Sequence, residues 1–388
     1  MGDMKMSNKE RRRLGILSRV KEGEITIRKA AGLLGTSYRQ TRRIYKRYCE
    51  EGDAGLVHRG RGKSSNRGFS EARKREILEL YKDKYNDFGP TLAAEKLELC
   101  DHFSTNPETL RQWLLERGLW TKKRKSKDHR RWRERKENVG EMVQMDGSPH
   151  DWFEGRREDA VLMVMIDDAS SRTHARFSEA ETTRGCMEIF WEYADTYGLP
   201  HSLYVDRHSI YRCEREPTVQ EQLEQTGPLT QFGRAMHKLG VCIKKANSPQ
   251  AKGRVERVNG TFQDRLIKEM RLERINTIAE ANRFLKEVYL ARFNEKFNVP
   301  PKNAADLHRN IAQEIDLDEV LCFEEQRQVQ NDWTVRWNNR CFQLTKRNRS
   351  RGLVKQPIKV REKLDGRISM AYKGHRLYFR EITGLAIG

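Results

Sequence analysis

Strand-like and helix-like segments alternate between residues 141 and 300, and this alternation limits the possible folds more than any other feature of the chain. Three apolar stretches, MVQMDGSPHDWF, AVLMVMIDDAS and HARFSEA, predict successive strands. They are followed by a predicted helix at CMEIFWEYADTYG, a strand at HSLYVD, a helix at LTQFGRAMHKLG, a strand at VCIKKAN and a long helix from about Gln250. The order β-β-β-α-β-α-β-α predicts a layered α/β core.

Two further patterns follow this core. Residues 277–297 predict another helix with aromatic side chains at helical spacing, which ends before the Pro300-Pro301 pair. From residue 331 onward, apolar and polar residues alternate with period two, and Asp365-Gly366 and Lys373-Gly374 are hairpin signals. We therefore expect a small basic β-barrel at 331–388, joined to the core by a linker at 301–330.

Residues 1–50 predict a DNA-binding helix-turn-helix. Thr26 can cap a helix that runs through Leu34, Gly35 supplies the turn, and Thr36 or Ser37 caps the next helix. Arg and Gln on that second helix suit guanine and adenine edges in the major groove. The side chains that we expect to project from it toward DNA are Tyr38, Arg39, Gln40, Arg42 and Arg43. An ordinary three-helix bundle with a basic face would show the same pattern.

The next segments predict a linker, a second helical module and a tether. Residues 51–69 are rich in Gly, Ser and Arg, which is typical of a flexible basic linker. Residues 70–120 predict three helices of a second helix-turn-helix or winged helix, with Arg111 and Gln112 on its open side. The tether at 121–140 is too basic for a packed core and can lie along phosphates. Its candidate DNA contacts are Lys122, Lys123, Arg124, Arg130 and Arg131.

The charge of the chain, +20 overall, is unevenly spread. Residues 1–140 hold 36 Lys and Arg against 20 Asp and Glu, residues 141–330 hold 26 against 32, and residues 331–388 hold 14 against 4. Basic flanks attract a phosphate backbone, and an acidic middle between them suggests carboxylates kept for metal binding. Charge runs of this kind are otherwise ordinary solvated surface.

The same sequence argues against several other classes of protein. No apolar run is long enough to span a membrane, and no apolar stretch follows the basic N-terminus as in a secretory signal. The seven cysteines are scattered without paired spacing, which disfavours a disulfide framework and a structural zinc site. We expect a cytoplasmic protein with no membrane partner.

Three acidic residues stand out by their positions. Asp146 lies at the end of the first predicted strand, Asp206 at the tip of LYVD, and Glu256 on the helix that follows SPQAKGR. Functional groups collect at strand ends in open α/β sheets, and a cluster of hard oxygen ligands suits Mg²⁺ or Mn²⁺. Any one of these acids could equally be a surface charge. Asp151 and the Asp167-Asp168 pair are rivals, although ASSR after the pair is typical of a turn.

The stretches MVQMDGSPHDWF, LYVDRHSIYR and ANSPQAKGRVERVNGTFQDRLIKE resemble the DDE transposases of bacterial insertion sequences, and most closely the unclassified group labelled ISNCY. These enzymes share an RNase H-like catalytic core with retroviral integrases. The resemblance covers residues 10–300 and implies that Asp146, Asp206 and Glu256 are catalytic and bind two Mg²⁺ or Mn²⁺ ions. Beside them, Lys252, Arg254 and Arg257 are expected to face phosphates.

The implied fold has several domains: all-α helix-turn-helix modules, an RNase H-like core at 141–300 and a C-terminal β-barrel. The implied reaction cuts the element ends to release 3′ hydroxyl groups and joins them to target DNA by two-metal-ion phosphoryl transfer. The implied partners are double-stranded DNA, as terminal inverted repeats and as target, and further copies of the chain, at least a dimer. Such a protein works in the bacterial cytoplasm, on the nucleoid.

This sequence departs from the family pattern at two places. The interval between Asp206 and Glu256 is longer than in compact integrase cores, with a polar insertion at 211–230, and Arg207-His208 replaces the usual Asn-Gly. Two other functions remain open: a sequence-specific DNA-binding regulator with an inactive integrase-like core, and a nuclease of the same fold without strand transfer. A tyrosine or serine recombinase is a weaker third, because no R…H-x-x-R…Y arrangement is present.

Overall fold

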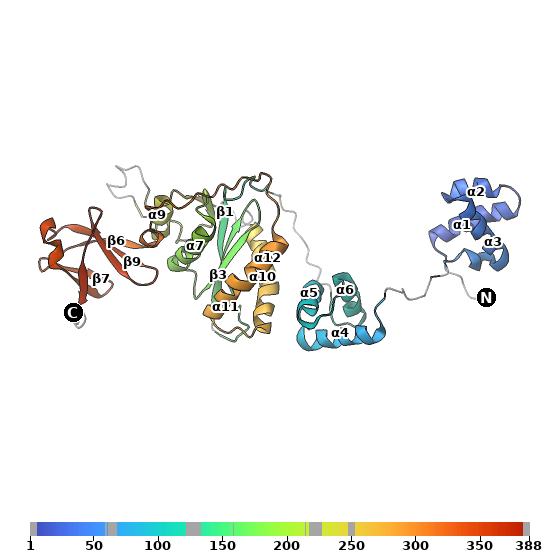
Figure 1. Ribbon diagram of the computed structural model, residues 1–388, viewed down its shortest axis with the longest axis horizontal. Helices are drawn as coiled ribbons and strands as arrows, with labels where there is room; N and C mark the ends of the chain where they lie inside the picture. Colours follow the sequence, from blue (N-terminus) through green and yellow to red (C-terminus); the bar gives the residue numbers. More distant parts are fainter. Residues whose placement is uncertain are drawn as a thin grey trace. The chain divides into compact units, whose positions relative to one another are not determined.

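The computed structural model places the chain in two compact units, Met1–Asn86 and Asp87–Gly388 (Figure 1). It describes residues 6–58, 60, 68–121, 133–157, 159–213, 215–216, 227–246 and 253–382. Among these residues, no helix is long and apolar enough to cross a membrane.

The first unit begins with the predicted helix-turn-helix. Its elements are α1 (Asn8–Lys21), α2 (Ile27–Leu34), α3 (Tyr38–Glu51) and the 3₁₀ turn η1 (Gly52–Leu56). Thr26 caps α2, Gly35 ends it in a left-handed conformation with φ 63°, and Ser37 caps α3, all as the sequence predicts. Leu56 is buried in the same core as Leu17 and Ile44, so the module extends past the predicted boundary at residue 50.

Three helices form in the segment predicted to be a second module. They are α4 (Glu71–Lys84) in the first unit, and α5 (Pro90–Asp101) and α6 (Pro107–Glu116) in the second. Ser70 and Asn106 cap α4 and α6, and proline occupies the first turn of both α5 and α6. Residues 68–121 contain no strand, which favours a helix-turn-helix over a winged helix.

The α/β core is confirmed in the predicted order. Its strands are β1 (Val143–His150), β2 (Ala160–Asp167), β3 (Thr173–Ser178), β4 (Ser202–Val205) and β5 (Cys242–Lys245). They form one mixed sheet in the order β3-β2-β1-β4-β5, in which only β2 runs against the others. Every residue of the apolar strand β2 is buried because both faces of the sheet are covered.

Helices cover the two faces of this sheet in separate layers (Figure 1). On one face, α7 (Thr183–Tyr197) and α9 (Gln231–Lys238) pack against Val143 and Leu203. On the other, α10 (Gly253–Leu272) and a helix at 278–297 pack against Leu162 and Val164. The latter helix runs as α11 (Ile278–Phe284), the π-helical turn η3 (Leu285–Tyr289) and α12 (Leu290–Phe297), and it ends before Pro300 as predicted.

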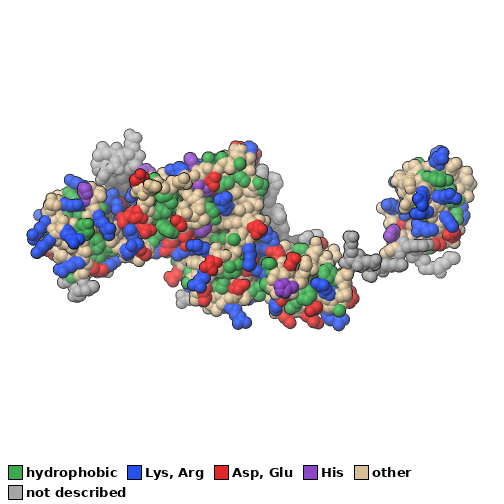
Figure 2. All heavy atoms as spheres, in the orientation of Figure 1, with side chains coloured by type: hydrophobic (Ala, Val, Ile, Leu, Met, Phe, Trp, Pro, Cys, Tyr) green, Lys and Arg blue, Asp and Glu red, His purple; other side chains and the backbone are tan. Residues whose placement is uncertain are grey.

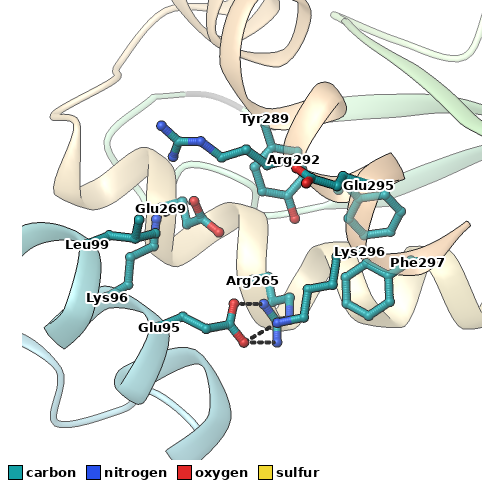
Figure 3. Close-up of a pocket in the computed structure, with 11 residues that line it drawn as sticks. Glu95, Lys96, Leu99, Arg265, Glu269, Tyr289, Arg292, Glu295, Lys296 and Phe297 are labelled. Atoms are coloured by element: carbon teal, nitrogen blue, oxygen red, sulfur yellow. Dashed lines mark hydrogen bonds and ion pairs between the residues drawn. The ribbon is translucent and has the colours of Figure 1, made fainter. Parts of the chain in front are cut away.

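Helix α5 is held against the outer side of α10 and α12 by charged pairs (Figure 3). Lys96 donates to Glu269 Oε2 at 2.5 Å, and both side chains are almost completely buried. Glu95 accepts two hydrogen bonds from Arg265, at 2.8 and 3.0 Å, and pairs with Lys296. Bidentate and buried pairs of this kind fix orientation, so α5 has a defined position on the α/β core.

Within the described residues 317–382, the C-terminal region forms two separate sheets, and the closed barrel that the sequence predicted is not shown. It has a four-stranded sheet, in the order β11-β10-β9-β6, and a three-stranded sheet, β12-β8-β7, which share one apolar core. The strands are β6 (Cys322–Gln328), β7 (Thr334–Trp337), β8 (Arg340–Leu344), β9 (Pro357–Lys363), β10 (Ile368–Tyr372), β11 (His375–Arg376) and β12 (Phe379–Ile382). The helical turns α13 (Leu317–Val320) and η4 (Lys346–Arg351) accompany them.

Both predicted hairpin turns in this region are present, at Asp365-Gly366 and at Lys373-Gly374, where φ is 45° and 80°. Strand β6, however, lies in the segment predicted to be a linker. These residues form a strand because they pair along their whole length with β9. Lys and Arg side chains are frequent on the visible surface of these sheets (Figure 2).

Candidate active site

The parallel pairing of β1 with β4 places the two candidate aspartates on neighbouring segments. Val143 lies opposite Leu203, and Gln144 lies opposite Tyr204. Asp146 and Asp206 each follow the last of these paired residues by two positions, and adjacent strands lie about 4.8 Å apart. Asp206 directly follows the end of β4, as predicted, whereas Asp146 is the fourth of the eight residues of β1 and not the end of a strand.

Asp146 faces the α10 side of the sheet. Side chains alternate between faces along a strand. The opposite face is occupied by the odd-numbered residues, which lie in the apolar core under α7 and α9: Val143, Met145, Leu203 and Val205. Asp146 alternates with Val143 and Met145 on β1 and contacts α10, and both Asp146 and Asp206 are partly exposed to solvent.

Helix α10 adds Asn259 and Glu256 to this face. Asn259 Nδ2 donates to Asp146 Oδ2 at 3.5 Å, whereas the Asn259 Oδ1 atom is buried with no hydrogen-bond partner. Glu256 precedes Asn259 by three residues, so the two side chains lie on the same side of the helix. Glu256 is exposed in the first turn of α10.

These side chains fit a divalent cation by their chemistry. Carboxylate oxygens are the ligands that Mg²⁺ and Mn²⁺ prefer, and a buried amide oxygen without a donor beside a carboxylate is a group that a cation would satisfy. Within the described part of the chain, however, no group of three or more His, Cys, Asp or Glu side chains lies close enough together to hold a metal ion. Asp146, Asp206 and Glu256 therefore do not form a complete ligand set in this structure.

The rival acids have other partners. Asp167 is completely buried and accepts hydrogen bonds from the Ser170 backbone, the Ser170 hydroxyl and the Gly140 backbone, which is the predicted role of a turn residue. Asp168 is also completely buried, but its donors come from distant segments. Asp151 is exposed and accepts from the Gly155 backbone at 3.0 Å.

Other side chains near the aspartates are structural. Trp152 and Tyr211 are core aromatics, 0% and 4% exposed. Burial raises the pKa of the Cys186 thiol to about 12, with Glu181 and Asp206 acting in the same direction, so this thiol is a poor nucleophile. His208 is exposed in the loop after β4, where its backbone N–H donates to Asp206 Oδ1 at 2.9 Å.

The predicted reading face of α3 is exposed. Thr41, Ile44 and Tyr48 form the buried side of this helix. The five candidate DNA contacts all point to solvent: Tyr38, Arg39, Gln40, Arg42 and Arg43. In α6, Arg111 is partly exposed and paired with Glu108, at 2.7 Å from Arg111 Nε, and Gln112 is exposed.

The basic residues predicted near the trio have different placements. Arg257 is exposed on α10. Arg254 is turned inward, where its Nη1 donates to Asp168 at 2.7 Å and its Nη2 donates to the Arg133 carbonyl at 2.8 Å. In this structure Arg254 thus makes an internal contact instead of facing a phosphate. Lys252 and the tether residues Lys122, Lys123, Arg124, Arg130 and Arg131 lie outside the described residues.

Two residues at the site were missed by sequence reasoning. A Cβ on Gly147 would lie 2.6 Å from Glu181 Oε2, so glycine after Asp146 lets the segment before α7 close on β1. Asp168, interpreted as a turn residue, is instead a buried acceptor. The only signal for Asp168 was that two consecutive acids follow an unbroken apolar strand, where both cannot face solvent.

The chain is similar in sequence to a family model and to two named transposases. Residues 12–64 match a family model described as a helix-turn-helix domain. The chain is 39% identical over 383 residues to "Putative transposase y4bF" of Sinorhizobium fredii, covering 98% of this chain and 82% of that protein. It is 27% identical over 363 residues to the transposase for insertion sequence IS1202 of Streptococcus pneumoniae, covering 84% and 76%.

Solved structures of integrases are also similar. The simian T-cell lymphotropic virus intasome matches with 15% identity, 55% of this chain, 78% of that chain and a TM-score of 0.33. The HTLV-2 integrase catalytic core, solved with magnesium, matches with 17% identity, 39% of this chain, 89% of that chain and a TM-score of 0.28. These scores are too low to support a detailed superposition. By its identity to y4bF over nearly its whole length, the chain belongs to the transposases of bacterial insertion sequences.

Proposed function

We propose that this transposase binds the terminal inverted repeats of an insertion sequence, cleaves the element ends to release 3′ hydroxyl groups and joins those groups to target DNA. The observation that supports this proposal most directly is that Asp146 on β1 contacts Asn259 of α10, while Asp206 directly follows the parallel neighbour strand β4. Acids on two neighbouring strands, next to a helix that carries a third, suit phosphoryl transfer.

In this proposal Asp146, Asp206 and Glu256 hold two Mg²⁺ or Mn²⁺ ions. When bound, the ions neutralise charge on the reacting phosphate and favour an in-line displacement. Because Glu256 is exposed and outside a three-carboxylate group in the structure, the first turn of α10 or the Glu256 side chain must shift toward Asp146 when DNA and ions bind. Asn259, in contact with Asp146, supports that carboxylate.

The basic modules hold the DNA. Tyr38, Arg39, Gln40, Arg42 and Arg43 read the end sequence in the major groove, and Arg111 and Gln112 contact a second part of the same end. The tether, with Lys122, Lys123, Arg124, Arg130 and Arg131, follows the phosphate backbone, and Lys252 and Arg257 contact phosphates beside the site. The C-terminal sheets, with 14 Lys and Arg against 4 acids after residue 330, hold flanking or target DNA.

The reaction needs no covalent protein–DNA intermediate. Water first attacks the phosphodiester at the element end, and the 3′ hydroxyl that leaves then attacks a phosphodiester of the target. No serine or tyrosine nucleophile is required in this proposal. Because two ends must be joined to one target, the active form is at least a dimer on DNA.

Mutation of the central acid tests the proposal. Full-length protein is incubated with DNA carrying the inverted repeats that flank its gene, a supercoiled target plasmid and Mg²⁺, and joined products are sequenced. Asp146→Asn should bind the ends as the wild type does but yield no cleaved or joined product, whereas Asp151→Asn, at a nearby exposed acid, should remain active.

The same assay separates the alternatives. Strand transfer by Asp146→Asn at the wild-type rate would remove the acidic trio from the mechanism. Wild-type protein that binds the ends without cutting them would be a DNA-binding regulator with an inactive core. Wild-type protein that cuts without producing any joined product would be a nuclease of the same fold.

A further inference from the structure

Asp168 collects hydrogen bonds from three segments that are far apart in the sequence. Its Oδ1 accepts from Gln144 Nε2 and from Arg254 Nη1, both at 2.7 Å, and pairs with Arg133 Nη2. Its Oδ2 accepts from the backbone N–H of Lys136 at 2.8 Å. The side chain has no exposed surface. Such a saturated buried carboxylate is costly to build and tightly specifies the position of its donors.

Two of these donors lie next to proposed metal ligands. Gln144 precedes Asp146 by two residues on β1, so both side chains point to the α10 face of the sheet. Arg254 precedes Glu256 by two residues in the first turn of α10. One carboxylate oxygen therefore ties the strand that carries Asp146 to the helical turn that carries Glu256, although Asp168 itself is completely buried.

The third donor segment is the end of the basic tether. Arg133 Nη2 and the Lys136 backbone both donate to Asp168, and the Arg133 carbonyl accepts from Arg254 Nη2 at 2.8 Å. Arg135 donates to the Asp168 carbonyl at 3.2 Å and to Ser171 Oγ at 2.7 Å. Residues 133–136 thus bind the same carboxylate that links β1 to the first turn of α10.

The charges make this arrangement depend on the carboxylate. The Arg254 side chain is only 10% exposed, and Asp168 is the acid with which it pairs. Without the Asp168 carboxylate, the buried Arg254 guanidinium would lie beside Arg133 with no negative charge to neutralise it. The first turn of α10 would then move away from its position against β1.

We propose that Asp168 is a positioning residue for the transposase reaction, which holds the first turn of α10, and with it Glu256, at the correct depth relative to Asp146. This inference rests on the proposed function of the acidic trio. Asp168 contacts neither DNA nor ion and acts through Gln144 and Arg254. Groups that orient metal ligands from behind contribute about 10–100-fold to metal affinity.

The test compares Asp168→Asn with Asp167→Asn in the full-length protein. Two quantities are measured: the MgCl₂ concentration that half-saturates the rise in melting temperature without DNA, and the concentration that half-saturates cleavage of end DNA. Asp168→Asn should raise both concentrations by about tenfold or more. Asp167→Asn, which removes a buried acid bonded only to Ser170 and Gly140, should lower the melting temperature and leave both unchanged.

A second variant guards against misfolding of the first. Gln144→Leu keeps the volume of the side chain and removes a single donor to Asp168, so a smaller shift in the same direction is expected. Combining Asp168→Asn with Arg254→Gln should add little to either single change, because the two side chains act as one unit.

The two hypotheses fail in different ways. If Asp146→Asn is inactive but both Asp168→Asn and Gln144→Leu show the wild-type dependence on Mg²⁺, the positioning role of Asp168 is wrong and the proposed function stands. If Asp146→Asn retains cleavage, the proposed function fails first. A parallel change for Asp167→Asn and Asp168→Asn would also overturn the inference, since it would reflect general loss of packing.

Discussion

The core contains two pairs of aspartates in different environments. Asp146 and Asp206 lie on β1 and directly after β4, and Asp167 and Asp168 lie at the turn between β2 and β3. Asp146 and Asp206 are partly exposed, and Asp146 contacts Asn259, whose buried amide oxygen has no hydrogen-bond partner among the described residues. Asp167 and Asp168 are completely buried, and each accepts at least three hydrogen bonds from protein donors. A carboxylate saturated by the protein stabilises the fold, whereas one that solvent reaches can accept a ligand.

Loss of Asp206 should have the largest effect on activity and almost none on stability. In Asp206→Asn we expect cleavage and strand transfer to fall to the level measured without protein, because the acid pair is incomplete. The free energy of unfolding should stay the same or rise slightly, because one of two neighbouring negative charges is removed. Product sequencing and urea denaturation measure the two effects. Loss of activity together with loss of cooperative unfolding would place Asp206 in the buried class instead.

Loss of Asp167 should reverse this pattern. Asp167→Ala leaves three buried donors, from Ser170 and Gly140, without an acceptor. We expect the free energy of unfolding of the core to fall by about 3 kcal/mol. Urea denaturation followed by tryptophan fluorescence measures it, with Asp167→Asn as the milder control. A loss below about 1 kcal/mol would show that the turn does not depend on this acid.

Addition of Mg²⁺ should distinguish the two pairs without any DNA. At ten times its dissociation constant, a ligand that binds only the folded state stabilises it by about 1.4 kcal/mol. We expect MgCl₂ to stabilise the wild type and Asp167→Asn equally, and to leave Asp206→Asn unaffected. Thermal melting with and without EDTA measures the difference. Equal stabilisation of all three proteins would place the ion somewhere other than the acid pair.

Local signals explain which parts of the fold the sequence predicted. Thr26, Gly35 and Ser37 act on the backbone within three residues of themselves, so the helix-turn-helix could be derived almost to the residue. The period of the apolar residues likewise identified the strands and helices of the core in order. The position of Asp206 after the end of β4 and of Glu256 on the helix after β5 followed from that order, whereas Asp146, expected at the end of a strand, lies inside β1.

The predictions that failed concern features that depend on contacts between residues far apart in the sequence. Strand β6 was assigned to a linker because only its first two residues, Cys322 and Phe323, are apolar, and its structure depends on pairing with β9 about 35 residues later. Whether two sheets close into a barrel depends on edge strands of that kind. Asp168 was assigned to a turn because its donors, such as Gln144 and Arg254, could not be known from its neighbours.

The smallest effect is expected at Asp151, the exposed acid five residues after Asp146. Its exposed carboxylate accepts a hydrogen bond from the Gly155 backbone N–H at 3.0 Å. Asp151→Ala should change the free energy of unfolding by less than about 1 kcal/mol and the cleavage rate by less than about twofold. Asp151 is close to Asp146 in sequence and carries the same charge. A tenfold loss of cleavage would therefore mean that closeness to Asp146 in the sequence, and not the pairing of β1 with β4, determines which acids take part in cleavage. An effect within the stated limits restricts the function to the acids that the strand register brings together.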